Sequence, residues 1–348
     1  GVMSHAASNT PEIQTQPGHR SPANAATEWR ERLIRTVAVI AVVYACYWIY
    51  WRWTSTMNTD GAAIVPSLIL LVAETWAFIG LCSFVMLTWK LTNRVAPPPP
   101  PGRTVDVFIT NFDEPLEVLR RTAIGARAIR YPHRTYLLDD GKRDDVKAMA
   151  EELGIGYIRR VHSNNAKAGN INHALSHTSG EFILQLDADH VPHPSIIDRM
   201  LGYFNDPKMA VVQAPQDFYN VTSFEHGSGV AYGEPFHEQT LFYRLLQPGK
   251  NRWNAAFWCG TNALVRTAAL REIGGAATDT ITEDIHTTIR FHRRGWKTVY
   301  HNEVLARGLA ADDAAQYQLQ RNRWGTGAMQ VLKLENPLVV PGLTLGQR

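Results

Sequence analysis

The sequence predicts an α/β fold class, in which a mostly parallel sheet carries helices on both faces, preceded by a hairpin of two transmembrane helices. Two long apolar segments come first and are followed by a run of prolines. After the prolines, short apolar strands alternate with amphipathic helices, a pattern typical of parallel sheets covered by helices. Each apolar segment reaches the ~20 residues that cross a hydrocarbon layer of ~30 Å.

Composition narrows the classes of function. The 348-residue chain has a net charge of only +3, and no basic stretch is interleaved with aromatic residues, so we expect no nucleic-acid partner. The three cysteines, Cys46, Cys82 and Cys259, are too far apart for a disulfide framework or a zinc site. His237 opens the stretch HEQTL, which lacks the second histidine of a metalloprotease helix, so we interpret the histidines as scattered surface or core residues.

The first 95 residues contain a tail and the predicted hairpin. Residues 1–28 are polar and predict a disordered tail, and residues 29–95 hold the apolar segments Leu33–Trp53 and Ala62–Trp89. Tyrosines and tryptophans cluster at the segment ends, as in the aromatic belts of membrane interfaces. The alternatives are a pair of buried helices in a soluble protein or a cleavable signal peptide. The aromatic clusters and the short polar link favour a membrane hairpin.

Basic residues predict the orientation of the hairpin. The link between the segments has Arg52 as its basic residue, whereas three precede the first segment and three follow the second: Arg30, Arg32, Arg35, Lys90, Arg94 and Arg103. The positive-inside rule therefore predicts a multi-pass protein of the inner membrane with both ends of the hairpin, and the domain that follows it, in the cytoplasm. Glu74 lies in the middle of the second segment, where a carboxylate is costly unless paired, so we expect it to contact another helix or a polar passenger.

A second region follows a stiff polyproline linker at 96–103. We expect an α/β domain over 104–335, with Asp113 capping a first helix that holds Pro115 in its first turn, and with Gly154 ending a second helix. The expected strands are TVDVFIT at 104–110, TYLLDD at 135–140, GYIRRV at 156–161, EFILQLDAD at 181–189 and MAVVQAPQ at 209–216.

Acidic residues follow two of these strands. Asp139 and Asp140 end one strand, and Asp187 and Asp189 end another. Ligands of parallel sheets bind beyond the carboxyl ends of the strands, so these side chains should converge on one crevice. Motifs for dinucleotides or for P-loop ATP binding are absent from the sequence. The D-x-D pair instead predicts Mg²⁺ or Mn²⁺ holding a nucleotide diphosphate, although a strand-end turn with two aspartates is the alternative.

The stretch ITED places two acids at the start of a helix. Thr282 is the expected N-cap, and Glu283 and Asp284 fall in the first turn. Acids favour helix N-termini for electrostatic reasons alone, so this motif carries little weight by itself.

The stretch QLQRNRW places Gln320, Arg323 and Trp324 on one helical face, at positions i, i+3 and i+4. Arginine suits bidentate phosphate binding, and tryptophan suits stacking on a sugar ring. A half-buried tryptophan beside a solvated arginine is the alternative interpretation.

Together and in this order, the motifs resemble those of the processive family 2 glycosyltransferases, and specifically the cellulose synthase catalytic subunit group. The resemblance covers about 106–330 and the hairpin, and it implies a GT-A glycosyltransferase domain. The signature D, D-x-D, T-E-D and Q-x-x-R-W matches Asp139, Asp187/Asp189, Thr282–Asp284 and Gln320/Arg323/Trp324. The stretches NNAKAGNINHAL, VQAPQDFYN and FWCGTNA also match.

The resemblance implies roles for these residues. Asp284 would be the general base, with Glu283 beside it. The metal, Mg²⁺ or Mn²⁺, would be held by Asp187 and Asp189. The donor-binding residues would be Glu114, Asp139, Asp140, Lys167, Asp187, Gln320 and Arg323. The acceptor-binding residues would be Trp324, Cys259 and Gly260.

The resemblance also implies a membrane-bound inverting transfer of glucose from UDP-glucose to a growing β-glucan, with a cellulose-like, β-1,3 or mixed linkage. Its partners would be the UDP-sugar, a glucan acceptor, membrane lipid and accessory subunits of a synthase. A non-processive transferase acting on a lipid or single acceptor, and a catalytically silent UDP-sugar-binding subunit, are the alternatives. Residues 336–348 would begin a membrane-interface region that is truncated here.

Overall fold

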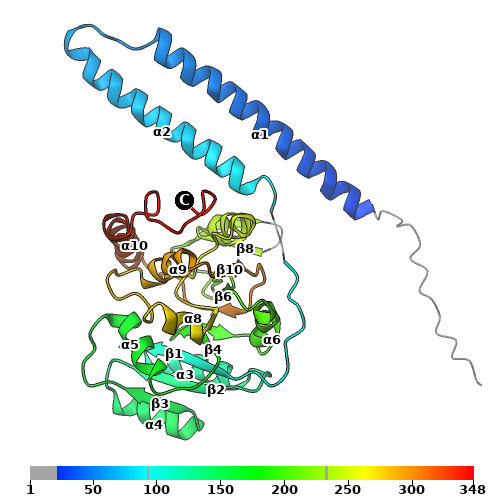
Figure 1. Ribbon diagram of the computed structural model, residues 1–348, viewed down its shortest axis with the longest axis vertical. Helices are drawn as coiled ribbons and strands as arrows, with labels where there is room; N and C mark the ends of the chain where they lie inside the picture. The colour runs from blue at the N-terminus through cyan, green and yellow to red at the C-terminus, as the bar shows by residue number, and fades with distance from the viewer. Residues whose placement is uncertain (1–21, 92–93, 232–233) are drawn as a thin grey trace, which may run out of the picture. The chain divides into compact units, whose positions relative to one another are not determined.

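The computed structural model describes residues 22–91, 94–231 and 234–348, and the chain divides into two compact units, Gly1–Trp89 and Lys90–Arg348. The first unit contains helices α1 (Pro22–Ser55) and α2 (Ile64–Thr88), joined through a short 3₁₀ turn at Gly61–Ala63 (Figure 1). Residues 1–21 of the predicted tail lie outside the described part of the chain. The other seven residues of that tail belong to α1, which begins at Pro22.

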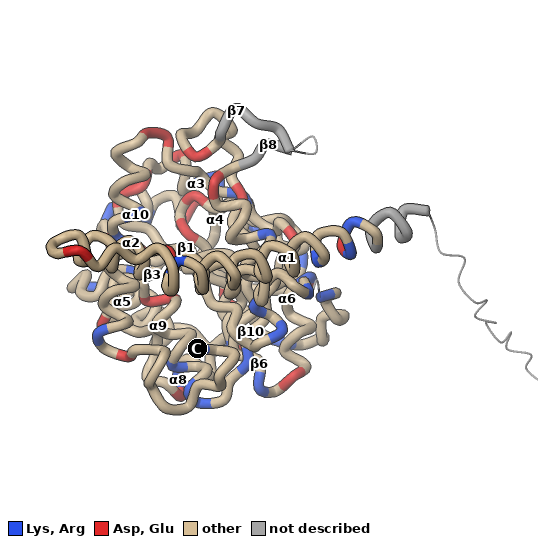
Figure 2. Tube along the Cα trace, turned by 90° about the horizontal axis from the view of Figure 1, so that it is seen from above, with Lys and Arg blue, Asp and Glu red and all other residues tan. Residues whose placement is uncertain are grey.

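Helices α1 and α2 are both long and apolar enough to cross a membrane, by length and composition. Most of their trace carries no charge (Figure 2). The charged exception in α2 is Glu74, whose Oε2 lies 2.7 Å from Nε of Arg52 in α1. Trp53 Nε1 also donates to Thr75 Oγ1 at 3.1 Å. The carboxylate in the middle of the second segment thus has a partner on the neighbouring helix, which offsets its cost in an apolar environment.

The second unit is built on a seven-stranded sheet with the order β10-β6-β9-β4-β1-β2-β3. Its pairings are parallel except for those of β9, which runs antiparallel to β4 and β6, so the sheet is mostly parallel as predicted. The strands are β1 (Val105–Asn111), β2 (Arg134–Asp139), β3 (Gly156–Arg159), β4 (Phe182–Asp187), β6 (Met209–Gln213), β9 (Ala263–Arg266) and β10 (Lys297–Tyr300). Two small sheets pair β5 (Val191–Pro192) with β11 (Ala306–Arg307) and β7 (His226–Ala231) with β8 (Glu234–His237).

Helices cover both faces of this sheet because successive strand side chains point to opposite sides. Along β4, Leu184 joins a cluster with α3 (Leu116–Arg127), α4 (Asp144–Leu153) and α6 (Ile196–Met200). Its neighbour Ile183 joins a second cluster with α5 (Ala166–Leu175), α8 (Thr267–Glu272) and α9 (Glu283–Arg293). The remaining helices are α7 (Gln247–Lys250) and α10 (Ala314–Leu334), with single turns at Leu201–Asn205, Phe242–Leu246 and Asn251–Trp253.

The strand register brings acidic residues to one edge of the sheet. Asp187 of β4 lies opposite Thr110 of β1, and Asp139 of β2 lies opposite Asn111. The two acids therefore flank the carboxyl end of β1, at the edge where ligands of α/β sheets bind.

Helix ends follow the sequence signals in one case and depart from them in another. Gly154 ends α4 with φ 64°, a left-handed conformation that glycine adopts without strain. The expectation that Asp113 caps α3 is wrong, because Pro115 occupies the N-cap position and the helix begins at Leu116. Proline has no N–H to leave unsatisfied at that position, so it starts the helix without a side-chain cap.

The last residues, 336–348, belong to the second unit and pack against its helices. Val340 and Leu343 pack with Ile289 of α9 and Val331 of α10. Gln347 Nε2 donates to the carbonyl of Asn254 at 2.9 Å. These contacts fix the end of α10 relative to α9.

Candidate active site

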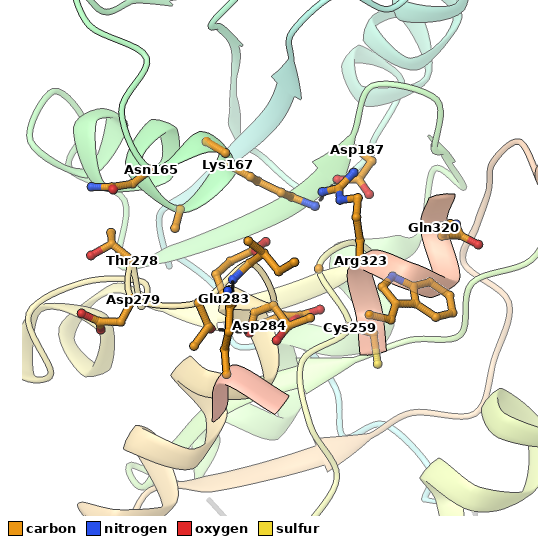
Figure 3. A pocket seen from close by; sticks show the side chains of 18 of the residues that line it. Asn165, Lys167, Asp187, Cys259, Thr278, Asp279, Glu283, Asp284, Gln320 and Arg323 are labelled. Carbon is orange, nitrogen blue, oxygen red and sulfur yellow. Dashed lines mark hydrogen bonds and ion pairs between the residues drawn. The ribbon is translucent and has the colours of Figure 1, made fainter. Parts of the chain in front are cut away.

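A cavity of about 520 Å³ lies at the carboxyl edge of the sheet, and five segments distant in sequence converge on it (Figure 3). They are the start of α5, the end of β4, the turn at Cys259–Gly260, the segment Thr278–Asp284 and one side of α10. The predicted residues that line the cavity are Lys167, Asp187, Cys259, Gly260, Glu283, Asp284, Gln320, Arg323 and Trp324. Three of the four ordered motifs, those around Asp187, Thr282–Asp284 and Gln320/Arg323/Trp324, thus contribute to its wall.

Lys167 and Asp187 form an ion pair at one side of the cavity. Burial lowers the pKa of Lys167, but the carboxylates of Asp187, Glu283 and Asp284 outweigh it, so the net shift is upward and the amine stays cationic. The Asp187 backbone N–H donates to the Thr261 hydroxyl at 2.9 Å, which fixes the end of β4.

Glu283 and Asp284 begin α9 side by side within the cavity wall. Burial is the main cause that raises the pKa of Asp284, to about 7, and the neighbouring Glu283 carboxylate adds to it. Burial raises the pKa of Glu283 as well, while Lys167 opposes the rise. A carboxyl group whose pKa lies near neutrality is suited to proton transfer.

Gly260 lies close to both Asp284 and Lys167. Its φ of +81° is left-handed, and a Cβ built there would lie 3.2 Å from Asp284 Oδ2 and 3.3 Å from Lys167 Nζ. The resemblance implied that Gly260 is an acceptor-binding residue. The structure adds that the glycine lets two opposite charges approach one backbone turn.

Thr282 occupies the N-cap position of α9 but its side chain makes no capping hydrogen bond. Its hydroxyl is buried and has no hydrogen-bond partner among the described residues. The expected cap is therefore only positional, and Thr282 instead packs against Gly327 of α10.

Asp187, Asp189 and His190 bring ligand atoms within 4.8 Å of one another, a suitable group for a divalent cation. Asp189 accepts from the Leu309 N–H at 2.9 Å, and its other oxygen lies 2.9 Å from His190 Nδ1. His190 Nε2 is buried and lacks a hydrogen-bond partner among the described residues. Two carboxylates and an imidazole form a donor set that suits Mn²⁺ and, through the oxygens, Mg²⁺. Asp189 itself does not line the cavity.

Helix α10 presents Arg323 and Trp324 to the cavity. Figure 3 shows Arg323 reaching from α10 toward Lys167 and Asp187. Trp324 is 39 % exposed, and the Arg321 guanidinium lies 4.4 Å from its ring centroid and 4.7 Å from that of Tyr317. This cation–π contact holds the indole in place while leaving it accessible.

A second, more apolar cavity of about 370 Å³ adjoins the first. The two share Gln216, Cys259, Thr282, Asp284 and Trp324 as lining residues. Burial raises the pKa of Cys259, so its thiol remains protonated, and Gln247 Nε2 lies 3.0 Å from its sulfur. An aromatic and aliphatic cavity beside the Asp284 carboxyl group is suited to the apolar face of a sugar.

Three predicted donor residues do not line the first cavity. Asp139 is fully buried, and Asp140 forms a two-pronged ion pair with Arg160 at 2.5 and 2.6 Å. Glu114 accepts from the Phe112 N–H at 2.8 Å, and burial, with a smaller contribution from Asp187, raises its pKa. The sequence placed Asp139 and Asp140 at the crevice because they end a strand, and the resemblance added Glu114. Spacing alone does not distinguish a side chain that faces the cavity from one turned inward.

Several cavity residues were not predicted. They are Asn165, Gln216, the segment Thr278–Ile281 and Gln330, together with His190 in the cation group and Arg321 behind Trp324. His190 follows the D-x-D pair directly, and that adjacency is a signal that would have found it. Asn165, Gln216 and Arg321 lie within stretches quoted in the sequence analysis, but their residue types did not single them out.

Comparison with known proteins identifies the family. Residues 100–327 match the family model described as glycosyltransferase like family 2. The chain is 40 % identical over 306 residues to the cellulose synthase catalytic subunit [UDP-forming] of Xanthomonas axonopodis pv. citri (strain 306), covering 85 % of this chain and 42 % of that protein. It is 41 % identical over 288 residues to the cellulose synthase 1 catalytic subunit of Komagataeibacter xylinus, covering 80 % of this chain and 38 % of the relative. The chain therefore spans about two fifths of the length of these relatives.

The fold has a solved counterpart. The mannosyltransferase PcManGT from Pyrobaculum calidifontis, in complex with GDP-Man and Mn²⁺, superimposes with a TM-score of 0.59 over 75 % of this chain and 73 % of its own, at 18 % sequence identity. At that identity the likeness establishes the fold, which is the GT-A glycosyltransferase fold expected from the sequence. From the family match over most of the second unit, together with this fold, the chain belongs to glycosyltransferase family 2.

Proposed function

We propose that the chain forms the membrane hairpin and catalytic domain of an inverting β-glucan synthase that transfers glucose from UDP-glucose to the end of a growing chain. The observation that carries the proposal is the convergence of Lys167, Asp284, Arg323 and Trp324 on one cavity beside an apolar one. The 40 % identity to cellulose synthase catalytic subunits supports the glucan product and the UDP-sugar donor.

In this proposal the donor lies on the side of the cavity formed by α5 and β4. The Lys167 amine and the Arg323 guanidinium would stabilise the negative charge on the departing diphosphate, because both face the cavity. Gln320 would add a polar contact from the same helix. The turns that hold the nucleotide would be shaped by three acids that do not line the cavity, Asp139, Asp140 and Glu114.

The acceptor would enter from the apolar cavity and stack on Trp324, beside Cys259 and Gly260. Asp284 would take the proton from the attacking sugar hydroxyl as that oxygen bonds to the anomeric carbon and the bond to the diphosphate breaks, which inverts the configuration. A single base is enough because the diphosphate leaves without protonation, whereas a glycosidase needs a second carboxylic acid. Glu283 would keep the pKa of Asp284 raised.

The proposed cofactor is a divalent cation, Mg²⁺ or Mn²⁺. Asp187 and Asp189 would hold it, and the chemistry of their donor set, with His190, fits such an ion. When bound, the cation would neutralise the charge of the nucleotide diphosphate. Lys167 would orient Asp187 through their ion pair.

We further propose that the hairpin spans the inner membrane and that the catalytic domain lies in the cytoplasm, where UDP-sugars are made. Arginines and lysines flank the outer ends of α1 and α2. A reporter fused after Gly102 should be cytoplasmic, and one in the 54–61 link should be periplasmic. The reverse pattern would contradict the orientation.

The decisive experiment incubates membranes carrying the full-length protein with labelled UDP-glucose and digests the product with linkage-specific glucanases. An insoluble product cleaved by one glucanase identifies a processive synthase and its linkage, whether β-1,4, β-1,3 or mixed. A single sugar on a lipid would identify the non-processive alternative. Binding of UDP-glucose without any product would identify a silent subunit of a synthase complex and overturn the proposal.

A further inference from the structure

The segment Thr278–Asp284, which ends at the proposed base, is held by α10 at two points. Gln330 Oε1 accepts a hydrogen bond from the Ile281 backbone N–H at 2.9 Å. One turn earlier in α10, Gly327 is buried against Thr282. A Cβ added to Gly327 would lie 2.3 Å from Thr282 Cγ2, 2.5 Å from its Oγ1 and 2.8 Å from its Cβ.

The contact at Gly327 is specific to that position in the helix. Gly325, two residues earlier, is exposed, and a Cβ there would meet nothing within 4 Å. Glycine weakens a helix interior relative to alanine, so its presence at 327 is explained by close approach, whereas nothing near Gly325 requires it. The backbone of α10 and the N-cap residue of α9 are therefore in direct contact.

Helix α10 also carries the cavity residues Gln320, Arg323 and Trp324. Successive helical positions in one continuous helix keep fixed spacings. One turn of α10 thus carries the Arg323 guanidinium and the Trp324 indole. The next turn contacts the start of α9, which begins with Glu283 and Asp284.

We propose that Gly327 and Gln330 are positioning residues that fix the N-terminus of α9, and with it Asp284, relative to Arg323 and Trp324. The inference rests on the proposed function, in which Asp284 is the base. Neither residue takes part in bond making. Their effect is to keep the carboxylate within reach of the acceptor hydroxyl, and a displacement of about 1 Å at a reacting group costs about 10²-fold in rate.

The first test compares Gln330→Met with Gln330→Glu in membranes carrying the full-length protein. Methionine keeps the length of the side chain but cannot accept the Ile281 N–H, whereas glutamate retains an acceptor oxygen. We expect Gln330→Met to lower kcat by about ten- to a hundredfold with the KM for UDP-glucose unchanged. Gln330→Glu should recover part of that loss. Met329→Ala, at an exposed neighbouring position, is the control and should behave as the wild type.

Hydrogen exchange provides a readout that does not depend on activity. The Ile281 amide should exchange faster in Gln330→Met than in the wild type and in Gln330→Glu, while the amides of β1 and β4 keep their protection and show that the fold is intact. A raised KM with an unchanged Ile281 amide would make Gln330 a donor contact and would overturn the positioning role.

The second test compares two glycines of one helix. Gly327→Ala should lower kcat because the new methyl group pushes Thr282 away, whereas Gly325→Ala should retain wild-type turnover. Adding Thr282→Ser to Gly327→Ala removes the nearest atom, Cγ2, and should restore part of the rate. Equal turnover in the two single variants would contradict the inference.

The two proposals fail in different ways. If the wild-type protein transfers no sugar, the proposed function fails, and the exchange experiment still tests the contact. If the wild type transfers sugar and Asp284→Asn does not, but Gln330→Met turns over normally with a protected Ile281 amide, only the positioning role fails.

Discussion

Two strands that flank β1 each end in a pair of acids, and the structure gives the pairs different surroundings. Asp139 and Asp140 follow β2, and Asp187 and Asp189 follow β4. In sequence the two pairs are equivalent candidates for binding a charged ligand. In the fold the first pair is turned into the protein, and Asp187 of the second faces the cavity.

The first pair is saturated by protein donors. Asp140 is paired with Arg160, which also donates to the carbonyls of Asn164 and Ala166 and so shapes the loop before α5. Asp139 accepts from four donors: Asn111 Nδ2, the N–H groups of Gly141 and Arg143, and the Tyr157 hydroxyl. A carboxylate with so many donors holds a turn together.

Asp187 is different because its cavity-side partner is a single lysine. A mobile cationic side chain can exchange partners when a ligand enters, whereas backbone N–H groups cannot move away. A carboxylate at a strand end is therefore not enough to predict a ligand-binding role. The number and kind of its hydrogen-bond donors distinguish an acid that organises a loop from an acid that can bind a ligand. The predictions below test this distinction.

The largest expected effect comes from Asp284, an acid of the cavity. Asp284→Asn keeps the shape of the side chain but cannot accept the acceptor proton, and general-base catalysis contributes about 10²–10⁴-fold. Transfer from UDP-glucose should fall by that factor. The affinity for UDP, measured by calorimetry, and the midpoint of unfolding should change little. If the variant transferred sugar at nearly the wild-type rate, the base would lie elsewhere, with Glu283 the next candidate.

The second effect should appear in stability. Asp140→Asn leaves the buried Arg160 guanidinium without its counter-charge, and breaking a buried ion pair costs about 3–5 kcal/mol. Urea denaturation followed by tryptophan fluorescence should show that loss. The matched control is Glu152→Gln, which removes the exposed partner of Arg120 and should leave the midpoint unchanged. Equal urea midpoints for Asp140→Asn and Glu152→Gln would show that the buried acid does not organise its loop, which contradicts the distinction between the two acid pairs.

The third effect concerns the proposed cation. Asp187→Asn should weaken UDP binding in Mg²⁺ or Mn²⁺ by at least about tenfold, because residues that hold or orient a metal typically contribute that much. In EDTA the variant and the wild type should bind UDP equally weakly. Wild-type affinity that is the same in EDTA and in Mg²⁺ would show that no cation bridges the protein and the diphosphate.

The smallest effect is a pH dependence. The folded protein raises the pKa of Asp284 from 3.8 to about 7, and the base is active when ionised. The ratio kcat/KM should therefore fall about tenfold per pH unit below 7 and level off above it. Residual transfer by Asp284→Asn should lack this acid limb, and a limb of unchanged position would assign the titration to another group.

The same titration affects stability. Because the folded state holds the Asp284 proton more tightly than the unfolded chain does, the stabilisation from this group is present below pH 4 and is lost as the pH rises to 7.

The sequence predicted the architecture well because its signals are local. Short apolar runs predicted the strands, and Gly154 ended α4 where a left-handed residue was needed. Asp187 also lies at the cavity as expected, because the carboxyl ends of parallel strands share one edge. The resemblance, and not the strand pattern, implied that Asp284 and Arg323 would join it. These predictions needed no knowledge of side-chain direction.

The predictions that depend on non-local contacts could not be made. Thr282 has the right type for a cap, but close contact with Gly327 turns it into a packing residue. Asp139 and Asp140 have the right position for a ligand, but each already accepts from a side chain of the protein. The donors are Tyr157 of β3 and Arg160, the residue after β3. His190 joins the acids through the fold around Gly308, whose missing side chain leaves space for the imidazole ring.

Gly260 has a consequence for the tolerance of this site to mutation. Its backbone has φ +81°, which strains any residue with a Cβ, and the space a Cβ would enter lies between the charged atoms of Asp284 and Lys167. The two restrictions are independent, so no size or polarity of side chain escapes both. In a saturation-mutagenesis library selected for polymer synthesis, codon 260 should return glycine alone, while codon 325 in the same library should accept many amino acids.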